Sequence, residues 1–176
     1  HPLENKKREV RNMCGFFISE LQSETHTQRI AGCLMQFNVR QGKRGRFAFA
    51  TLDDGSGKIE VSIWADVFEK YRNLLKKGQV LVVEGMIEKD DYSDSMRHKM
   101  IAEKILTFDQ ARYEYIKNIK IDIEDDIEQT NKIVRSLKEI ATSNEGNTVL
   151  ISYKGNSAKA DIILPENFSV KLDDAS

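Results

Sequence analysis

Short strand-like runs of apolar residues, separated by turn signals, begin at Arg29. The first run covers residues 29–39 and ends at a stretch that contains two glycines. The second, 47–52, is closed by Asp-Asp-Gly-Ser-Gly, a hairpin signal because glycine adopts positive φ without steric cost. The third, 59–64, alternates apolar and polar residues with the period of a half-buried strand. The pattern therefore predicts three consecutive strands.

A helix and two further strands complete this part of the chain. Apolar residues between Val67 and Leu75 fall at helical spacing, and Gly78 follows as a C-terminal stop. The runs 80–87 and 96–106 predict two more strands, joined by a polar loop. Five strands with a helix between the third and the fourth is the order of the OB-fold, a five-stranded Greek-key barrel. The alternative, an SH3-like barrel, lacks a helix of this length at that point.

The rest of the chain divides into shorter segments. Residues 1–28 are predicted to form a polar lead-in with a short helix, residues 29–108 the barrel, and residues 109–117 a linking helix. Residues 118–176 read as strand, helix, strand and strand, a small βαββ domain whose tail stops before completing another element. We therefore expect a mainly β protein with an α+β appendage. The chain also starts without a Met, and we expect it to be a truncated piece of a longer one.

The second strand carries the first candidate binding residues. If Ala48, Ala50 and Leu52 point into the barrel, Phe47 and Phe49 point outward on the face that OB-folds use for ligands. Exposed aromatic rings of this kind are platforms on which unpaired bases stack. The alternative is that the opposite face is the buried one, which would place both phenylalanines in the core.

Basic residues gather in the loop before this strand. Four cations lie within seven residues, and cations at the mouth of a groove neutralise backbone phosphates. Lys58, just before the third strand, joins them as a further candidate. Alternatively, the basic loop is merely solvated. The predicted nucleic-acid-binding residues are Arg40, Lys43, Arg44, Arg46, Phe47, Phe49 and Lys58.

Other residues have structural interpretations. Trp64 and Tyr71 are predicted to pack in the core or against the helix, and Asp53 with Asp54 to shape the hairpin turn. The acidic run 90–94 lacks the glycine and terminal glutamate of a calcium loop, and we expect an exposed loop. Neither a metal-ligand set nor a nucleophile–base pair appears, so the sequence predicts no catalytic residue, metal or cofactor in this piece.

Charge is distributed unevenly along the chain. The formal net charge is −1, yet residues 1–120 hold 21 basic and 17 acidic side chains, whereas residues 121–176 hold 6 and 11. This asymmetry predicts two segments with different partners. No apolar run approaches the roughly 18 residues of a membrane span, so no membrane is expected. The two cysteines form no C-x-x-C pair and are too few for a disulfide scaffold, which favours a reducing compartment, and we expect a cytoplasmic protein.

The run from Lys43 to Val61, followed by Tyr-Arg-Asn-Leu-Leu and Leu-Val-Val-Glu-Gly, resembles the C-terminal part of the bacterial DNA polymerase III alpha subunit. The resemblance covers residues 1 to about 120 well and is weaker beyond. It implies a replicative DNA-directed DNA polymerase, a nucleotidyltransferase, whose catalytic carboxylates and Mg²⁺ lie upstream of this piece. It also implies that the barrel contacts single-stranded template DNA, and that the following segment docks the tau subunit of the clamp loader among other replisome subunits.

Two features depart from that family. The chain ends before the helix that follows the last hairpin, and the loop between the fourth and fifth strands carries three aspartates that would repel phosphates. Two other functions stay open: a barrel that serves mainly protein–protein interaction, and the anticodon-binding OB domain of a class II tRNA synthetase.

Overall fold

A computed structural model describes residues 1–22, 26–89, 98–124, 126–142, 146–155, 158–165 and 168–170. The chain divides into two compact units, His1–Ala111 and Arg112–Ser176. Each unit has its own sheet and its own apolar core. Among the described residues, no helix has both the length and the apolar character that a bilayer crossing requires.

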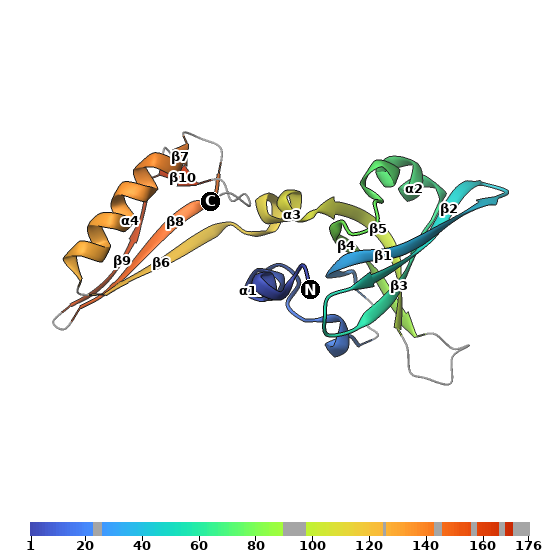
Figure 1. Ribbon diagram of the computed structural model, residues 1–176, viewed down its shortest axis with the longest axis horizontal. Helices are drawn as coiled ribbons and strands as arrows, with labels where there is room; N and C mark the ends of the chain where they lie inside the picture. The colour runs from blue at the N-terminus through green and yellow to red at the C-terminus, as the bar shows by residue number, and fades with distance from the viewer. Residues whose placement is uncertain are drawn as a thin grey trace. The chain divides into compact units, whose positions relative to one another are not determined.

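The first unit contains a closed five-stranded barrel with the strand order β1-β2-β3-β5-β4 (Figure 1). Its elements are β1 (Gln28–Gly42), β2 (Gly45–Asp53), β3 (Lys58–Ile63), α2 (Ala65–Tyr71), the 3-10 turn η3 (Arg72–Leu74), β4 (Val80–Lys89) and β5 (His98–Thr107). β3 and β5 pair in parallel, and every other pairing is antiparallel. With α2 between β3 and β4, this is the OB-fold, which confirms the predicted fold class.

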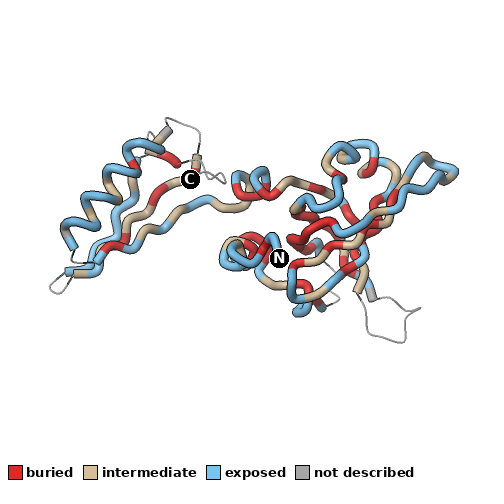
Figure 2. The backbone as a smooth tube through the Cα atoms, in the orientation of Figure 1, coloured by how far each residue is buried: buried red, intermediate tan, exposed pale blue. Residues whose placement is uncertain are grey.

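The barrel core follows from the alternation along its strands. On β2, Ala48, Ala50 and Leu52 are buried, whereas the residues between them are half-buried on the outside. Figure 2 shows the buried positions concentrated in the barrel strands. The predicted inward and outward faces of β2 are therefore confirmed, because successive side chains of a strand point to opposite faces.

β4 and β5 approach each other closely at a bulge beside Gly85. A Cβ atom on this residue would overlap the backbone carbonyl of Ile101 in the neighbouring strand. Only glycine therefore permits this pairing, and the bulge lets both strands curve enough to close the barrel.

The N-terminal segment packs on the barrel and belongs to the same unit. It comprises η1 (Glu4–Lys6), α1 (Lys7–Cys14) and η2 (Ile18–Glu20). Leu3, Val10 and Met13 are almost completely buried. The backbone N–H of Ile18 donates to the buried Asp54 carboxylate at 2.8 Å, which ties η2 to the β2–β3 turn.

The second unit is built on a three-stranded sheet of order β6-β8-β9. β6 and β8 are parallel, as the intervening helix α4 requires, and β8 and β9 form an antiparallel pair, so the predicted βαββ order is confirmed. A short pair, β7 with β10, was not predicted. The elements are α3 (Phe108–Tyr115, which spans the division between the units), β6 (Asn118–Glu124), α4 (Ile127–Ile140), β7 (Ala141–Thr142), β8 (Thr148–Lys154), β9 (Lys159–Ile163) and β10 (Ser169–Val170).

Candidate nucleic-acid interface

The outer face of β2 and β3 presents two parallel rows of side chains. On β2 the row consists of Phe47, Phe49 and Thr51, each half-buried. β3 pairs with β2 so that Ser62 lies beside Phe49, and the same alternation continues to Trp64, the residue that directly follows the strand. The aromatic residues therefore gather at one end of this face, beside the β1–β2 turn.

Phe47, Phe49 and Trp64 form an aromatic cluster. The ring centroids of Phe47 and Phe49 are 5.6 Å apart, with the ring planes nearly perpendicular at 89°. The Trp64 ring lies 5.5 Å from Phe47 and 6.3 Å from Phe49. These are edge-to-face or tilted contacts, which aromatic pairs prefer over face-to-face stacking. Each ring therefore helps to fix the orientation of the other two.

The prediction that Trp64 is a core or helix-packing residue is wrong. Its relative exposure is 47%, among the highest of the large hydrophobic residues that the structure describes. The strand alternation that exposes Lys58 and Glu60 already placed Trp64 on the outer face, and this was the signal that could have identified it. The companion prediction for Tyr71 is confirmed, because its half-buried side chain packs against the barrel core.

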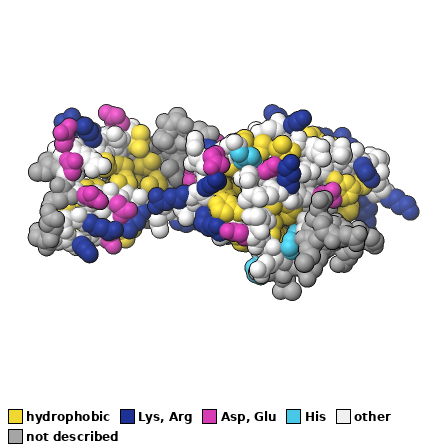
Figure 3. All heavy atoms as spheres, turned by 60° about the horizontal axis from the view of Figure 1, so that its bottom comes forward, with side chains coloured by type: hydrophobic (Ala, Val, Ile, Leu, Met, Phe, Trp, Pro, Cys, Tyr) yellow, Lys and Arg dark blue, Asp and Glu magenta, His cyan; other side chains and the backbone are white. Residues whose placement is uncertain are grey.

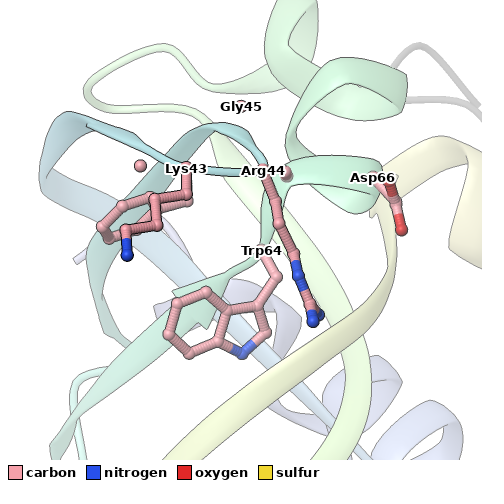
Figure 4. Close-up of a pocket in the computed structure, with 8 residues that line it drawn as sticks. Lys43, Arg44, Gly45, Trp64 and Asp66 are labelled. Atoms are coloured by element: carbon pink, nitrogen blue, oxygen red, sulfur yellow. The ribbon is translucent and has the colours of Figure 1, made fainter.

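A cleft of about 650 Å³ lies between the β1–β2 turn and the start of α2. Its lining comprises Gly42, Lys43, Arg44, Gly45, Phe47, Trp64, Ala65 and Asp66. In Figure 4 the side chains of Lys43 and Arg44 extend from the turn toward the side where the Trp64 indole lies, whereas the Asp66 carboxylate points elsewhere. The cleft thus combines an aromatic surface with two cations.

Glycine shapes the turn that carries these cations. Gly45 adopts a φ of +117°, which side-chain-bearing residues rarely adopt, and it pairs with Gly42 across the turn. A Cβ on Gly42 would lie only 3.0 Å from the Phe47 ring. The missing side chain therefore lets the Phe47 ring lie directly against the backbone.

Three of the predicted cations lie near the aromatic cluster. The Arg40 guanidinium lies 5.5 Å from the centroid of the Phe49 ring, within cation–π range. Lys43 and Arg44 occupy the tip of the hairpin, where basic side chains gather at the right edge of the view in Figure 3. We call this region, with the aromatic cluster, the hairpin end of the barrel.

The structure does not bring Arg46 and Lys58 to the hairpin end. Arg46 lies on the opposite side of β2, where its guanidinium pairs with Glu69 at 2.9 Å and covers the Phe68 ring. Lys58 shares the outer face but begins β3, roughly 20 Å from Trp64 at about 3.3 Å per residue. Its ammonium lies 3.7 Å from the Asp53 carboxylate. The seven predicted residues are therefore not one continuous site.

The aspartates of the β2–β3 turn have the predicted structural role. Asp54 is buried, and its Oδ1 accepts hydrogen bonds from the N–H groups of Ser56 and Gly57 and from the Ser56 hydroxyl. Asp53 accepts from the N–H of Gly55. Within the described part of the chain, no group of His, Cys, Asp and Glu side chains could hold a metal ion. The predicted acidic loop, with Asp90, Asp91 and Asp94, lies outside the described residues.

Comparison with known families first identifies a model that matches the barrel. The family model of the OB-fold nucleic acid binding domain, tRNA_anti-codon, matches residues 29–107, which coincide with the barrel strands. Among solved structures, a replication factor A related protein from Methanobacterium thermoautotrophicum is similar over 54% of this chain and 91% of its own. That similarity has 17% identity and a TM-score of 0.45. The strand topology makes the barrel an OB-fold, and its range coincides with that of a family model described as a nucleic acid binding domain.

Two curated relatives define the family more narrowly. The DNA polymerase III subunit alpha of Pseudomonas aeruginosa is 29% identical over 172 residues, 97% of this chain and 14% of that protein. The subunit from Escherichia coli strain K12 is 31% identical over 145 residues, 78% of this chain and 12% of that protein. The chain belongs to the DNA polymerase III alpha subunit family and spans about one-seventh of the length of these relatives.

Proposed function

We propose that the barrel binds single-stranded DNA at its hairpin end, as one part of a replicative DNA polymerase. The observation that supports this proposal is the meeting of the aromatic cluster with Arg40, Lys43 and Arg44. Aromatic rings that stack on bases and cations that follow the phosphates are the two components of single-strand binding. The polymerase reaction and its Mg²⁺ belong, in this proposal, to parts of the longer protein outside this stretch. The chain alone is expected not to extend a primed template supplied with deoxynucleotides and Mg²⁺.

Duplex DNA fits this face less well than a single strand does. The bases of a duplex are stacked on one another, so the aromatic cluster could reach them only after unstacking, at a cost of a few kcal/mol per base. An unpaired strand offers the same phosphates together with open base faces. We therefore expect the barrel to bind a single strand more tightly than a duplex with the same number of phosphates.

Charge reversal at the tip of the hairpin tests the proposal. We expect Lys43→Glu combined with Arg44→Glu to abolish most of the anisotropy change of a fluorescent twelve-nucleotide oligothymidine at 50 mM salt. The matched control is Lys76→Glu with Lys77→Glu, an adjacent pair of exposed lysines outside both the cleft and the outer face of β2 and β3. Equal binding by both double variants would refute the assignment of the hairpin end.

The same titration separates the two alternative functions. A barrel that serves protein interaction would leave the anisotropy unchanged in the wild-type chain. An anticodon-binding barrel would bind tRNA or a matching RNA loop more tightly than oligothymidine, so these RNAs are included as competitors. Displacement of oligothymidine by DNA and RNA in proportion to their phosphate number and open bases would support the proposal.

For the second unit we propose protein docking, with the tau subunit of the clamp loader as partner. β9 pairs only with β8 in the described sheet, and Ile162 and Ile163 on it are 51% and 70% exposed. An exposed apolar edge strand can accept a strand from another chain. We expect Ile163→Lys to weaken tau binding in isothermal calorimetry, with Lys159→Glu as a charge control on the same strand. Unchanged affinity in Ile163→Lys would remove β9 from the contact.

A further inference from the structure

The aromatic cluster cannot take a base between its rings. A base inserted between two parallel rings needs them roughly 7 Å apart, twice the ~3.4 Å separation of stacked bases. The centroids in the cluster lie 5.5–6.3 Å apart, and the interplanar angles range from 38° to 89°. The three rings therefore form one continuous platform, and a base can only stack on its outside.

The two phenylalanines offer little open ring surface for such a base. The Arg40 guanidinium already covers the Phe49 ring, with 5.5 Å between the guanidinium carbon and the centroid. Phe47 lies against the backbone at Gly42, so close that a Cβ there would be 3.0 Å from the ring. Both side chains are half-buried and less exposed to solvent than Trp64. They support the third ring more than they receive a base.

Trp64 has the surface that the phenylalanines lack. It is 47% exposed, and it forms one wall of the cleft into whose opening Lys43 and Arg44 extend (Figure 4). At about 650 Å³ the cleft lies within the range of about 300–1,000 Å³ that small-ligand sites occupy, which suits a nucleotide and not a duplex. The cations occupy neighbouring positions at its rim, where the phosphates on either side of a seated nucleotide would pass.

Resting on the proposed function, we infer that Trp64 is the main stacking residue, and that it receives one unpaired base in the cleft beneath the β1–β2 turn. Phe47 and Phe49 position the indole through their edge contacts, and Lys43 with Arg44 bind the phosphates that flank this base. The base contact makes recognition depend on an unpaired nucleobase, whereas the cations alone would accept any polyanion.

Trp64 is the only tryptophan in the chain, so tryptophan emission comes from this residue alone. The experiment uses the whole chain and two probes: a twelve-nucleotide oligothymidine and an abasic oligomer with the same number of phosphates. Anisotropy of labelled probes measures binding, and tryptophan emission with unlabelled probes measures stacking. We expect oligothymidine to quench the emission and the abasic oligomer to leave it unchanged.

Two variants complete the test. Trp64→Ala is expected to bind oligothymidine about 5- to 150-fold more weakly, the loss of one base–aromatic stack, and to bind the abasic oligomer like the wild type. Trp64→Phe keeps a ring and should recover most of the affinity. Thermal melting of both variants verifies the fold, and the wild-type quenching stays decisive if Trp64→Ala does not fold.

The outcomes separate this inference from the function on which it rests. If wild-type anisotropy rises with oligothymidine while tryptophan emission stays constant and Trp64→Ala binds equally well, the inference is overturned and single-strand binding stands. If the wild type binds neither probe, both fail. Equal quenching by the two oligomers would also overturn it, because the indole would then be responding to phosphate and not to a base.

Discussion

The salt dependence that we expect for the proposed DNA binding follows from how the predicted cations are placed. Arg46 is paired with Glu69 on the other side of β2, and Lys58 lies near Asp53 at the far end of β3. Three cations at the hairpin end can then bind the phosphates of a single strand: Arg40, Lys43 and Arg44. For single strands the logarithm of the binding constant falls with the logarithm of salt concentration by about 0.7 per neutralised phosphate.

Three neutralised phosphates give a slope of about −2.1, so raising NaCl from 50 to 200 mM should weaken binding roughly 18-fold. All five predicted cations would give a slope of about −3.5 and a loss of roughly 130-fold. Anisotropy titrations of labelled oligothymidine at four salt concentrations distinguish these values. Arg44→Ala should reduce the slope to about −1.4, because one phosphate contact is lost.

Arg46→Ala provides the matched control, since it removes an equal charge two residues away in the sequence. We expect it to leave the slope near the wild-type value and to act on stability through the lost contacts with Glu69 and Phe68. A wild-type slope of about −3.5, or equal reductions of the slope in Arg44→Ala and Arg46→Ala, would refute this division of the cations.

Three further predictions concern the scaffold. Gly85→Ala should force β4 and β5 apart and cost about 3 kcal/mol or more in urea unfolding, whereas Gly15→Ala, with open space around it and a φ of +87°, should cost about 1–2 kcal/mol. Asp54→Ala removes the acceptor of the buried Ile18 N–H and of the part-buried N–H groups of Ser56 and Gly57, and it should cost about 2–4 kcal/mol, with faster hydrogen exchange in the N-terminal segment. The Arg11 guanidinium and the Phe17 N–H lower the pKa of Glu20 from its ordinary 4.5 to about 2. The ionised Glu20 carboxylate therefore stabilises the fold above pH 4.5, and this contribution is lost as the pH falls toward 2. In Arg11→Met, NMR titration should find that pKa shifted toward 4.5; an unchanged value would contradict the pairing.

The barrel could be predicted because its signals are local. Period-two alternation determines which face of β2 is buried, and this placed Phe47 and Phe49 on the outside correctly. Trp64 was misassigned because tryptophan is more often a packing residue than a ligand contact, although Trp64 also continues the outward row of β3. The turn role of Asp54 was likewise readable from the Asp-Gly-Ser-Gly sequence.

The rest depends on contacts between distant parts of the chain. Arg46 looks like its basic neighbours in sequence, and only the packing of α2 beside β2 brings Glu69 to it, 23 residues away. The attachment of the N-terminal segment includes a hydrogen bond between Ile18 and Asp54, 36 residues apart. The β7–β10 pair joins two-residue strands, too short for any periodic pattern to appear.

Amide chemical-shift mapping of the whole ¹⁵N-labelled chain with oligothymidine tests most directly whether the hairpin end is the DNA-binding site. The account predicts the largest changes at residues 40–49 and 62–66, including the indole N–H of Trp64. Small changes are expected at the β2–β3 turn and in residues 112–176. Changes confined to the second unit, or to α1 and the β2–β3 turn, would contradict it.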